Sequence, residues 1–158
     1  MYPHLSRRTL LGTLVALVAA APSLVRAQGM EKFTTGTLSI MSNGKRHDFN
    51  IELALTDRQQ EQGLMFRRSL APDAGMLFDY KTPTRITMWM RNTFIPLDMI
   101  FIGADGKVVD IAERAVPQSE AIIPSRVPAR AVLEVNGGTV QRLGIKVGDT
   151  VESDALQV

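Results

Sequence analysis

Apolar and polar side chains alternate in the first third of the chain, which is the pattern of a half-buried β-strand. Apolar residues occupy every second position from Phe49 to Leu55. Asn43-Gly44, just before this segment, is the strongest two-residue hairpin signal. The pattern predicts an antiparallel hairpin with strands over residues 33–41 and 47–55.

Further short segments have the length and composition of strands, at the spacing typical of β-sandwiches and barrels. These segments are residues 76–80, 86–91, 97–102, 108–115, 131–135 and 150–153. Residues 97–102 are apolar apart from Asp98, which predicts a central strand covered on both faces. The predicted fold class is mainly β: a single compact antiparallel sandwich or barrel, jelly-roll-like, with one or two short helices.

Two short helices are predicted by their end signals. Thr56-Asp57-Arg58-Gln59 is a capping-box pattern, and Gly63 is suited to end that helix in the left-handed conformation. The helix has only about two turns, so packing against the rest of the domain must hold it. A second helical turn is predicted over residues 139–143, ended by Gly144.

The longest irregular connection, Pro117 to Pro128, contains three prolines and no alternation of polar and apolar residues. Such a loop either forms a lid or binding loop or simply wraps the domain. Ile122 and Ile123 favour the second interpretation, because they are apolar enough to be tucked against the strands.

The first residues read as an export signal. Arg7-Arg8 precedes an uncharged run from Thr9 to Pro22, and Val25-Arg26-Ala27 is a small-residue cleavage site. The run is too short for a membrane helix, which needs about 20 apolar residues. This predicts a twin-arginine-type signal peptide and a periplasmic or secreted bacterial protein. A general-secretion signal that happens to contain two arginines is the alternative.

These signals divide the chain into four parts. The expected boundaries are the signal peptide over residues 1–27, an N-terminal lead-in over 28–36, a single β domain over 37–153 and a C-terminal tail over 154–158.

Composition limits the partners of the exported chain. Three of the 18 basic residues lie in the leader, which leaves 15 basic against 16 acidic side chains. A net charge of about −1 gives no electrostatic case for nucleic acid or an anionic membrane as partner. The sequence has no cysteine, so disulfides, a lipoprotein anchor, thiolate metal sites and cysteine nucleophiles are not expected.

Five sequence blocks in order resemble the family catalogued as domain of unknown function 192. The blocks are Gly63-Leu64-Met65-Phe66-Arg67, Gly75-Met76-Leu77-Phe78, the run from Met88 to Phe101 that contains Trp89, Arg91, Asn92 and Asp98, Val132-Leu133-Glu134, and Gly144-Ile145-Lys146-Val147-Gly148-Asp149. The resemblance covers about residues 37–151 and implies a compact, jelly-roll-like β domain without an established activity. Many relatives have two cysteines in the loop that corresponds to Pro117 to Ser125. This chain has none there, so any function that depends on those thiols is absent.

The block around Trp89 contains the candidate ligand-binding residues. If it is a strand, Trp89 and Arg91 project on one face and make an apolar platform beside a charged fork, which suits a sugar or a carboxylated small molecule. With Arg67 and Asn92 they are the predicted ligand-binding residues. The alternative is that Trp89 belongs to the core and Arg91 pairs with Asp98 or Glu134.

Two carboxylates in apolar surroundings, Asp98 and Glu134, are the candidate catalytic residues of an alternative interpretation. They would divide acid and base roles in an enzyme that acts on envelope carbohydrate, with Arg91 assisting. The alternative is a structural role, in which each carboxylate accepts hydrogen bonds from an arginine or from backbone amides. His47 is the single histidine after the leader, and no nucleophile elbow or phosphate loop is present. We therefore expect binding rather than catalysis.

No metal site and no cofactor are predicted. Several methionines within the matched blocks raise Cu(I) binding through thioethers as a hypothesis, but methionine is a common gap filler in cores. The leading function is a small periplasmic module that binds a saccharide or other small polar ligand, or an envelope protein, without stable membrane insertion. The alternatives are the carboxylate-dependent enzyme and a ligand-free structural or accessory protein.

Overall fold

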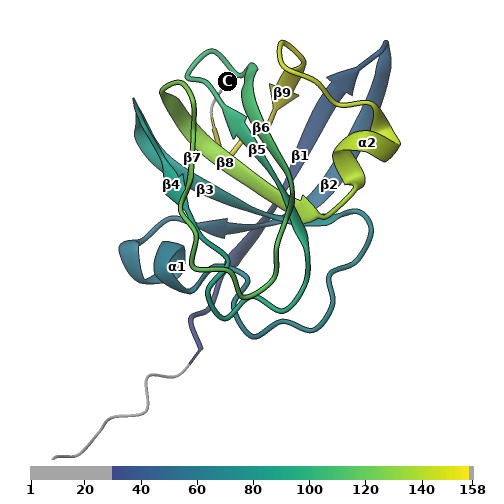
Figure 1. Cartoon of the computed structure of the whole chain (residues 1–158). Coiled ribbons are helices and arrows are strands. Elements are labelled where there is room, and N and C mark those ends of the chain that lie inside the picture. Colours follow the sequence, from purple (N-terminus) through teal and green to yellow (C-terminus); the bar gives the residue numbers. More distant parts are fainter. Residues whose placement is uncertain (1–29, 157–158) are drawn as a thin grey trace, which may run out of the picture.

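A computed structural model describes residues 30–156, so the predicted signal peptide lies outside the described residues. Within that range the chain forms nine strands and two short helices (Figure 1). The strands are β1 (Thr34–Ser42), β2 (Lys45–Ala54), β3 (Ala74–Thr84), β4 (Thr87–Met88), β5 (Leu97–Ile102), β6 (Val108–Ala115), β7 (Ile123–Pro124), β8 (Ala129–Asn136) and β9 (Thr150–Glu152), and the helices are α1 (Asp57–Gln62) and α2 (Thr139–Leu143). The prediction of a mainly β domain with two short helices is confirmed.

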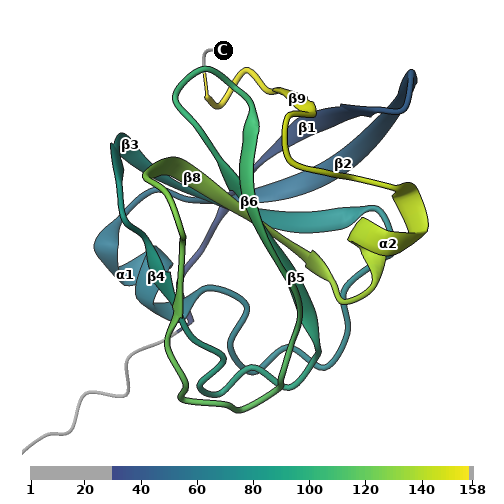
Figure 2. The same ribbon diagram turned by 45° about the horizontal axis from the view of Figure 1, so that its top comes forward.

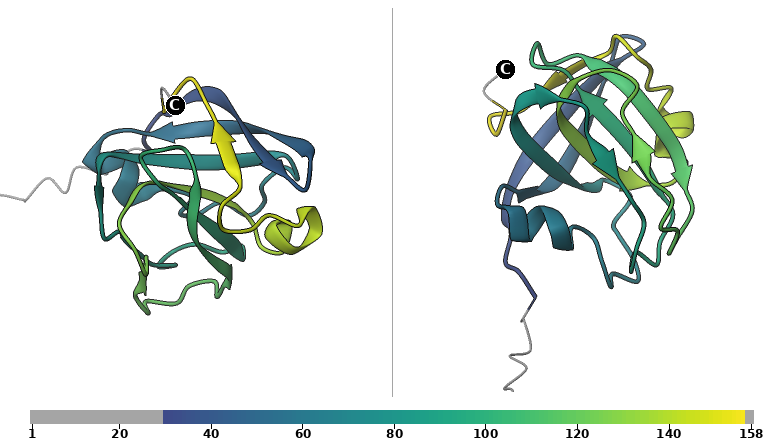
Figure 3. Two further views of the ribbon diagram at one scale, coloured as in Figure 1. Left: turned by 90° about the horizontal axis from the view of Figure 1, so that it is seen from above. Right: turned by 60° about the vertical axis from the view of Figure 1, so that its left-hand side comes forward.

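Seven of the strands form one strongly curled sheet in the order β6-β5-β8-β3-β2-β1-β9. Its two edges meet at one end, where Val151 donates its backbone N–H to Gly106 over 2.7 Å and Val108 donates to Asp149 over 2.9 Å. The sheet is therefore barrel-like, as the view from above shows (Figure 3). β4 and β7 form a separate two-stranded sheet.

The strand pairs are antiparallel with one exception, because β2 and β3 run parallel. The connection that contains α1 returns the chain to the middle of β2 before β3 begins, so that Asn50 lies opposite Ala74. Sequence alternation cannot distinguish this crossover from a hairpin, because both connections bury the same residues.

The Asn43-Gly44 hairpin forms as predicted between β1 and β2. Both residues have positive φ, 52° and 73°, as a type I′ turn requires. Ser42 then pairs with Lys45 and the register continues to Thr34 and Leu53. A slip by one residue would turn Leu38, Ile40 and their neighbours out of the core.

The central strands are buried on both faces. One apolar cluster fills the inside of the curled sheet and includes Ile40, Ile51, Leu77, Ile100 and Leu133. A second cluster lies on the outer face of β3, β5 and β8 under β4 and the neighbouring loops; it includes Met76, Phe78, Met99, Phe101 and Val132. All six residues of β5 are buried, which explains why both of its alternating sets are apolar apart from Asp98.

Helix α1 begins with the predicted capping box between Thr56 and Gln59. Two expectations about it are wrong. Gly63 ends it with φ 46° and ψ −134°, which is not the left-handed helical conformation, and none of the residues of α1 is buried. Hydrogen bonds hold the helix instead: Gln60 Nε2 donates to Ala54 and Asp79, and Gln59 Nε2 donates to Lys32 over 2.7 Å.

The connection Pro117 to Pro128 wraps the domain and supplies β7, which pairs with β4. Ile123 packs against the outer apolar cluster as expected, whereas Ile122 is 60% exposed. Asp110 fastens the end of the loop by accepting from the backbone N–H of Arg126 over 2.7 Å and pairing with its guanidinium. The predicted strand over residues 86–91 shrinks to Thr87–Met88, because the chain turns at Arg91.

Candidate functional site

Trp89 and Arg91 stack on each other after β4. The guanidinium carbon of Arg91 lies 4.1 Å from the centre of the Trp89 ring, within the range of a cation–π contact. Trp89 is 37% exposed, so it does not belong to the core. No carboxylate of residues 30–156 lies within 4.0 Å of Arg91, so the ion pairs with Asp98 or Glu134 considered above are absent.

The guanidinium of Arg91 has N–H donors without hydrogen-bond partners among the described residues. Its Nε atom is buried and has no hydrogen-bond partner among the residues that the structure describes. A buried donor without a partner is costly, and stacking on Trp89 fixes the plane in which the donors of the fork lie. Arg91 is thus held in one orientation with unused capacity to bind an acceptor.

Backbone contacts fix the loop that carries this stack. Asn92 and Phe66 both have positive φ, 57° and 65°, and Phe66 donates its N–H to the carbonyl of Asn92 over 2.8 Å. Gln118 in turn donates to Thr93 over 3.0 Å. A bulky residue such as Phe66 rarely adopts positive φ, and such strain concentrates at functional sites. The side-chain amide of Asn92 points back to the Met65 sulfur, 3.9 Å away, so it supports the loop.

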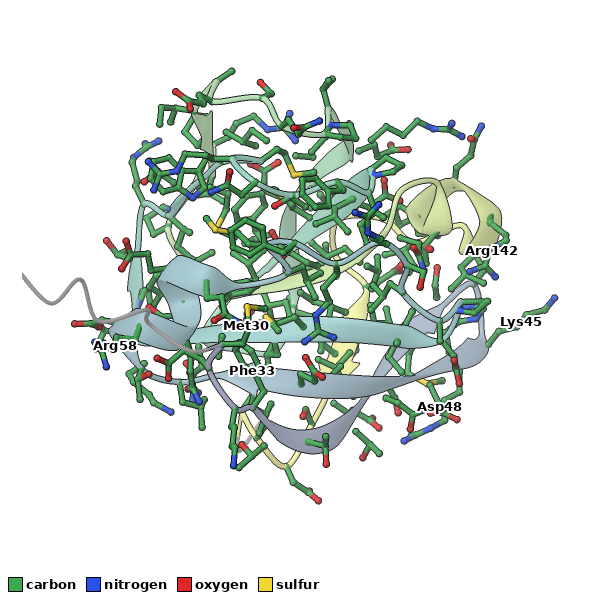
Figure 4. The ribbon with its side chains drawn as sticks, turned by 90° about the horizontal axis from the view of Figure 1, so that it is seen from below. Met30, Phe33, Lys45, Asp48, Arg58 and Arg142 are labelled. Atoms are coloured by element: carbon green, nitrogen blue, oxygen red, sulfur yellow. The ribbon has the colours of Figure 1, made fainter. Side chains whose placement is uncertain are left out.

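Arg91 faces a hollow of about 230 Å³ at the end of the molecule where the N-terminal lead-in meets α1. Figure 4 views this end and labels Met30, Phe33 and Arg58. Arg58 also lines the hollow and, like Arg91, forms no ion pair within residues 30–156. The complete lining is Met30, Glu31, Arg58, Glu61, Gln62, Met65, Phe66 and Arg91.

A second, narrower pocket of about 70 Å³ adjoins this hollow, because Glu61, Gln62 and Met65 line both. It lies where α1 and β4 approach each other (Figure 2). Trp89 lines it from the loop after β4 and Glu134 from β8. The lining consists of Gln60, Glu61, Gln62, Gly63, Leu64, Met65, Phe78, Tyr80, Thr87, Met88, Trp89, Thr93 and Glu134.

Glu134 has an unusual electrostatic environment. The residue is 4% exposed, and burial raises its pKa to about 8, because a charged carboxylate is poorly solvated there. The pKa of the nearby Tyr80 hydroxyl is also raised, first by burial and then by Glu134. Tyr80 places its hydroxyl 3.7 Å from the Met88 sulfur. The carboxyl group of Glu134 is therefore largely protonated at neutral pH.

Asp98 and Glu134 project from opposite faces of the sheet. Glu134 lies on the outer face with Val132, whereas Asp98 lies on the inner face with Ile100. Asp98 accepts from the backbone N–H of Arg114 over 2.8 Å, and from those of Gly138 and Val140 over 2.9 Å each. Asp98 thus anchors the start of α2, and the two carboxylates cannot act together on one substrate.

Arg67 is separated from the Trp89–Arg91 stack. It pairs with Glu52 and lies over the Phe33 ring at 6.0 Å. Together with Thr35 and Leu70 it lines a different, mostly apolar hollow of about 510 Å³. The structure therefore places Trp89, Arg91 and Asn92 on one loop but not the fourth predicted binding residue.

Sequence reasoning missed two exposed aromatic residues beside the site. Phe66 is 51% exposed and meets Phe94 edge to face, with ring centres 6.2 Å apart. The guanidinium of Arg68 lies 6.0 Å from the Phe94 ring. Alternation predicts which residues are buried, but these two belong to irregular segments. The one available signal was the run Phe66-Arg67-Arg68, in which a large apolar residue precedes two charges.

The methionines of the matched blocks fall into two groups. Met76, Met90 and Met99 are fully buried in the outer cluster, whereas Met65 and Met88 line the pocket of Glu134. Within residues 30–156 the structure contains no group of three or more histidine, cysteine, aspartate or glutamate residues arranged to hold a metal ion. The same residues include no helix that is long and apolar enough to span a membrane.

Comparison with known proteins identifies the family. The model of DUF192, described as an uncharacterised ACR, matches residues 38–153. The chain belongs to this DUF192 family. A UPF0127 protein of Pyrococcus furiosus is 29% identical over 112 residues, which are 68% of this chain and 91% of that protein. Neither description states an activity.

Two solved structures resemble the chain closely. A Sinorhizobium meliloti protein described as a candidate transcription regulator is 49% identical with a TM-score of 0.76, over 79% of this chain and 98% of that one. A Novosphingobium aromaticivorans protein of unknown function is 46% identical with a TM-score of 0.72, over 89% and 99% of the two chains. The DUF192 fold described above is thus shared with these bacterial relatives.

Proposed function

We propose that this DUF192 protein is a binding module for a small polar ligand that carries a carboxylate or another anionic group. The observation that carries the proposal is the Arg91 guanidinium, which is stacked on Trp89 without an acidic partner among residues 30–156 and faces a hollow of about 230 Å³. Arginine binds carboxylates through two parallel hydrogen bonds. Arg58 in the same hollow adds a second positive charge. The exposed edge of Trp89 offers an apolar contact to the body of the ligand, as for a sugar ring.

The geometry favours binding over catalysis. The paired-carboxylate mechanism would need Asp98 and Glu134 on one side of a substrate, and they lie on opposite faces of the sheet. A nucleic-acid ligand, which the description of the Sinorhizobium relative would suggest, finds little support in 15 basic against 16 acidic residues after the leader. Arg67 is left out of the proposed site, because Glu52 already binds its guanidinium.

We also propose that the protein acts in the bacterial periplasm. The support is the Arg7-Arg8 pair, the uncharged run after it and the cleavage site that ends at Ala27. Replacement of both arginines by lysine should leave the uncleaved chain in the cytoplasmic fraction, measured by immunoblot of fractionated cells. Unchanged cleavage and periplasmic recovery of that variant would contradict the twin-arginine route.

A thermal-shift screen of the chain from Gln28 tests the binding proposal. Uronic acids, N-acetylmuramic acid and small hydroxy acids are the probes, because each joins a carboxylate to hydroxyl or amide groups. A ligand at about 100 times its dissociation constant adds about 2.7 kcal/mol to the unfolding free energy. The stabilisation should disappear in Arg91→Met, which keeps the apolar stem over Trp89 and removes the charge.

Arg142→Met is the matched control, since Arg142 is exposed on α2 away from the site. It should bind like the unmodified protein. Stabilisation that survives Arg91→Met, or no stabilisation by any of the acids, would contradict the proposal. A blank screen would favour the envelope-protein alternative, for which Phe66 and Phe94 supply exposed apolar contacts.

A further inference from the structure

The pocket over Glu134 is small and chemically mixed. Elements α1, β3, β4 and β8 enclose it, and at about 70 Å³ it exceeds the roughly 10–15 Å³ that one water molecule requires. Its wall combines apolar side chains (Leu64, Phe78, Met88 and Trp89) with glutamine, glutamate and threonine side chains. Such a space accepts a polar group of a few atoms rather than a whole sugar ring.

Glu134 is the deep polar group of this pocket and has no partner among the residues that the structure describes. It forms no side-chain hydrogen bond and no ion pair with residues 30–156, although it is only 4% exposed. Two other deeply buried carboxylates of the same sheet are well satisfied: Asp98 has three backbone donors, and Asp79 is bound by Lys81 and Arg130. Buried carboxyl groups are normally paired, because an unpaired one lowers stability. An unpaired carboxyl group that faces a cavity is typical of a ligand-binding group.

Resting on the proposed function, we propose that Glu134 selects the ligand: its pocket binds an uncharged amide group of the same molecule whose anionic group lies at Arg91. Glu61, Gln62 and Met65 line both spaces, so a molecule that extends past these residues would reach both. A protonated carboxyl group has one O–H donor. The carbonyl oxygen of an amide is a strong, uncharged acceptor for it. The ligand class is therefore a carboxylated molecule with an amide substituent, such as an N-acetylated acidic sugar.

The protonation state of Glu134 makes the inference measurable. With a pKa of about 8 the group is protonated below neutral pH and ionised above pH 8. The other titratable groups that face the pocket are Tyr80 from β3 and Glu61 from α1, and Glu31, Arg58 and Arg91 line the adjoining hollow. Ionised Glu134 has no proton to donate to an amide carbonyl, so binding should weaken as the pH rises through this value.

Isothermal titration calorimetry with N-acetylmuramic acid provides the test on the chain from Gln28. The protonated fraction of Glu134 falls about tenfold between pH values of about 6.5 and about 9, so the affinity should fall about tenfold as well. Glu134→Gln keeps a donor and an acceptor in the pocket, so it should remove the pH dependence. Glu134→Ala should lose about tenfold or more at the lower pH. Glu113→Gln, an exposed change on β6, should behave like the unmodified protein.

The outcomes separate this inference from the proposed function. If N-acetylmuramic acid binds through Arg91 but with the same affinity at both pH values and in Glu134→Ala, the inference is wrong and the proposed function stands. Binding of glucuronic acid without binding of N-acetylmuramic acid would also overturn the inference and leave the proposed function standing, because glucuronic acid has no amide. If no carboxylated probe binds the unmodified protein, both proposals fail.

Discussion

Glu134 is the residue at which stability and the proposed function oppose each other. Its neighbours along β8 are apolar and fully buried, and a leucine or methionine there would pack without an electrostatic penalty. Burial raises the pKa of its carboxyl group to about 8 from an ordinary 4.5. A group whose pKa is higher in the folded than in the unfolded protein contributes its full stability at a pH below the unfolded-state pKa. That contribution is lost as the pH rises through the folded-state pKa. The loss therefore falls between pH 4.5 and about 8.

Glu134→Gln should consequently stabilise the protein at alkaline pH. We expect the variant to exceed the unmodified protein by about 2–4 kcal/mol in unfolding free energy near pH 8 and by little at pH 4.5, because the amide does not ionise. Urea denaturation followed at both pH values measures the difference. A variant that is less stable than the unmodified protein at pH 8 would show that the carboxylate has a partner in solution.

Residue-level reasoning from the sequence identified the Trp89–Arg91 pair but not its surroundings. Alternation placed the two side chains on one face, and they do meet although the strand ends at Met88. The sequence could not reveal that Asp98 and Glu134 lie on opposite faces, since the strand pairing that relates β5 to β8 joins residues far apart in the chain. Nor could it separate Arg67 from the stack. Its charged partner Glu52 lies on β2, and the two meet only through the parallel β2–β3 pair and the loop between α1 and β3.

At the scale of elements, local signals predicted the strands well and the contacts between them poorly. β5 and β6 have the predicted bounds, and Asn43-Gly44 forms the expected turn. The capping box predicted where α1 begins, but not that glutamine side chains hold the helix in place of apolar packing. Capping depends on neighbouring residues, whereas the acceptors Asp79 and Lys32 are brought to α1 only by the completed fold.

The position of α1 links its stability to the candidate site. Gln62 lines both the hollow of Arg91 and the pocket of Glu134. Its side-chain oxygen also accepts from the backbone N–H of Glu31 over 2.7 Å. The lead-in segment and α1 thus form one wall of the site. A short helix without buried residues is easily displaced, which makes this wall the part of the site that adjusts to a ligand.

For the whole molecule, the curled sheet is the rigid support of the site. β3, β5 and β8 are covered on both faces, and Glu134 projects from the middle of this layer. The loop with Trp89 and Arg91 is tied to the long connection through Met90 and Ser119, whose backbone groups lie 2.9 Å apart. Supported in this way, the part of the site on the sheet and this loop is formed before the ligand arrives, and preformed sites lose less entropy on binding.

Tryptophan fluorescence measures the central claim most directly, because Trp89 is the only tryptophan of the sequence. A carboxylated probe that stabilises the protein should change the emission of Trp89 with the same dissociation constant that calorimetry gives, since the ligand lies against the ring and its stacked arginine. Glucuronic acid and N-acetylmuramic acid are the probes, and Arg91→Met should abolish the change. A probe that stabilises the protein with equal affinity but leaves the Trp89 emission unaltered would place binding elsewhere, in the hollow of Arg67 for example, and would contradict this account.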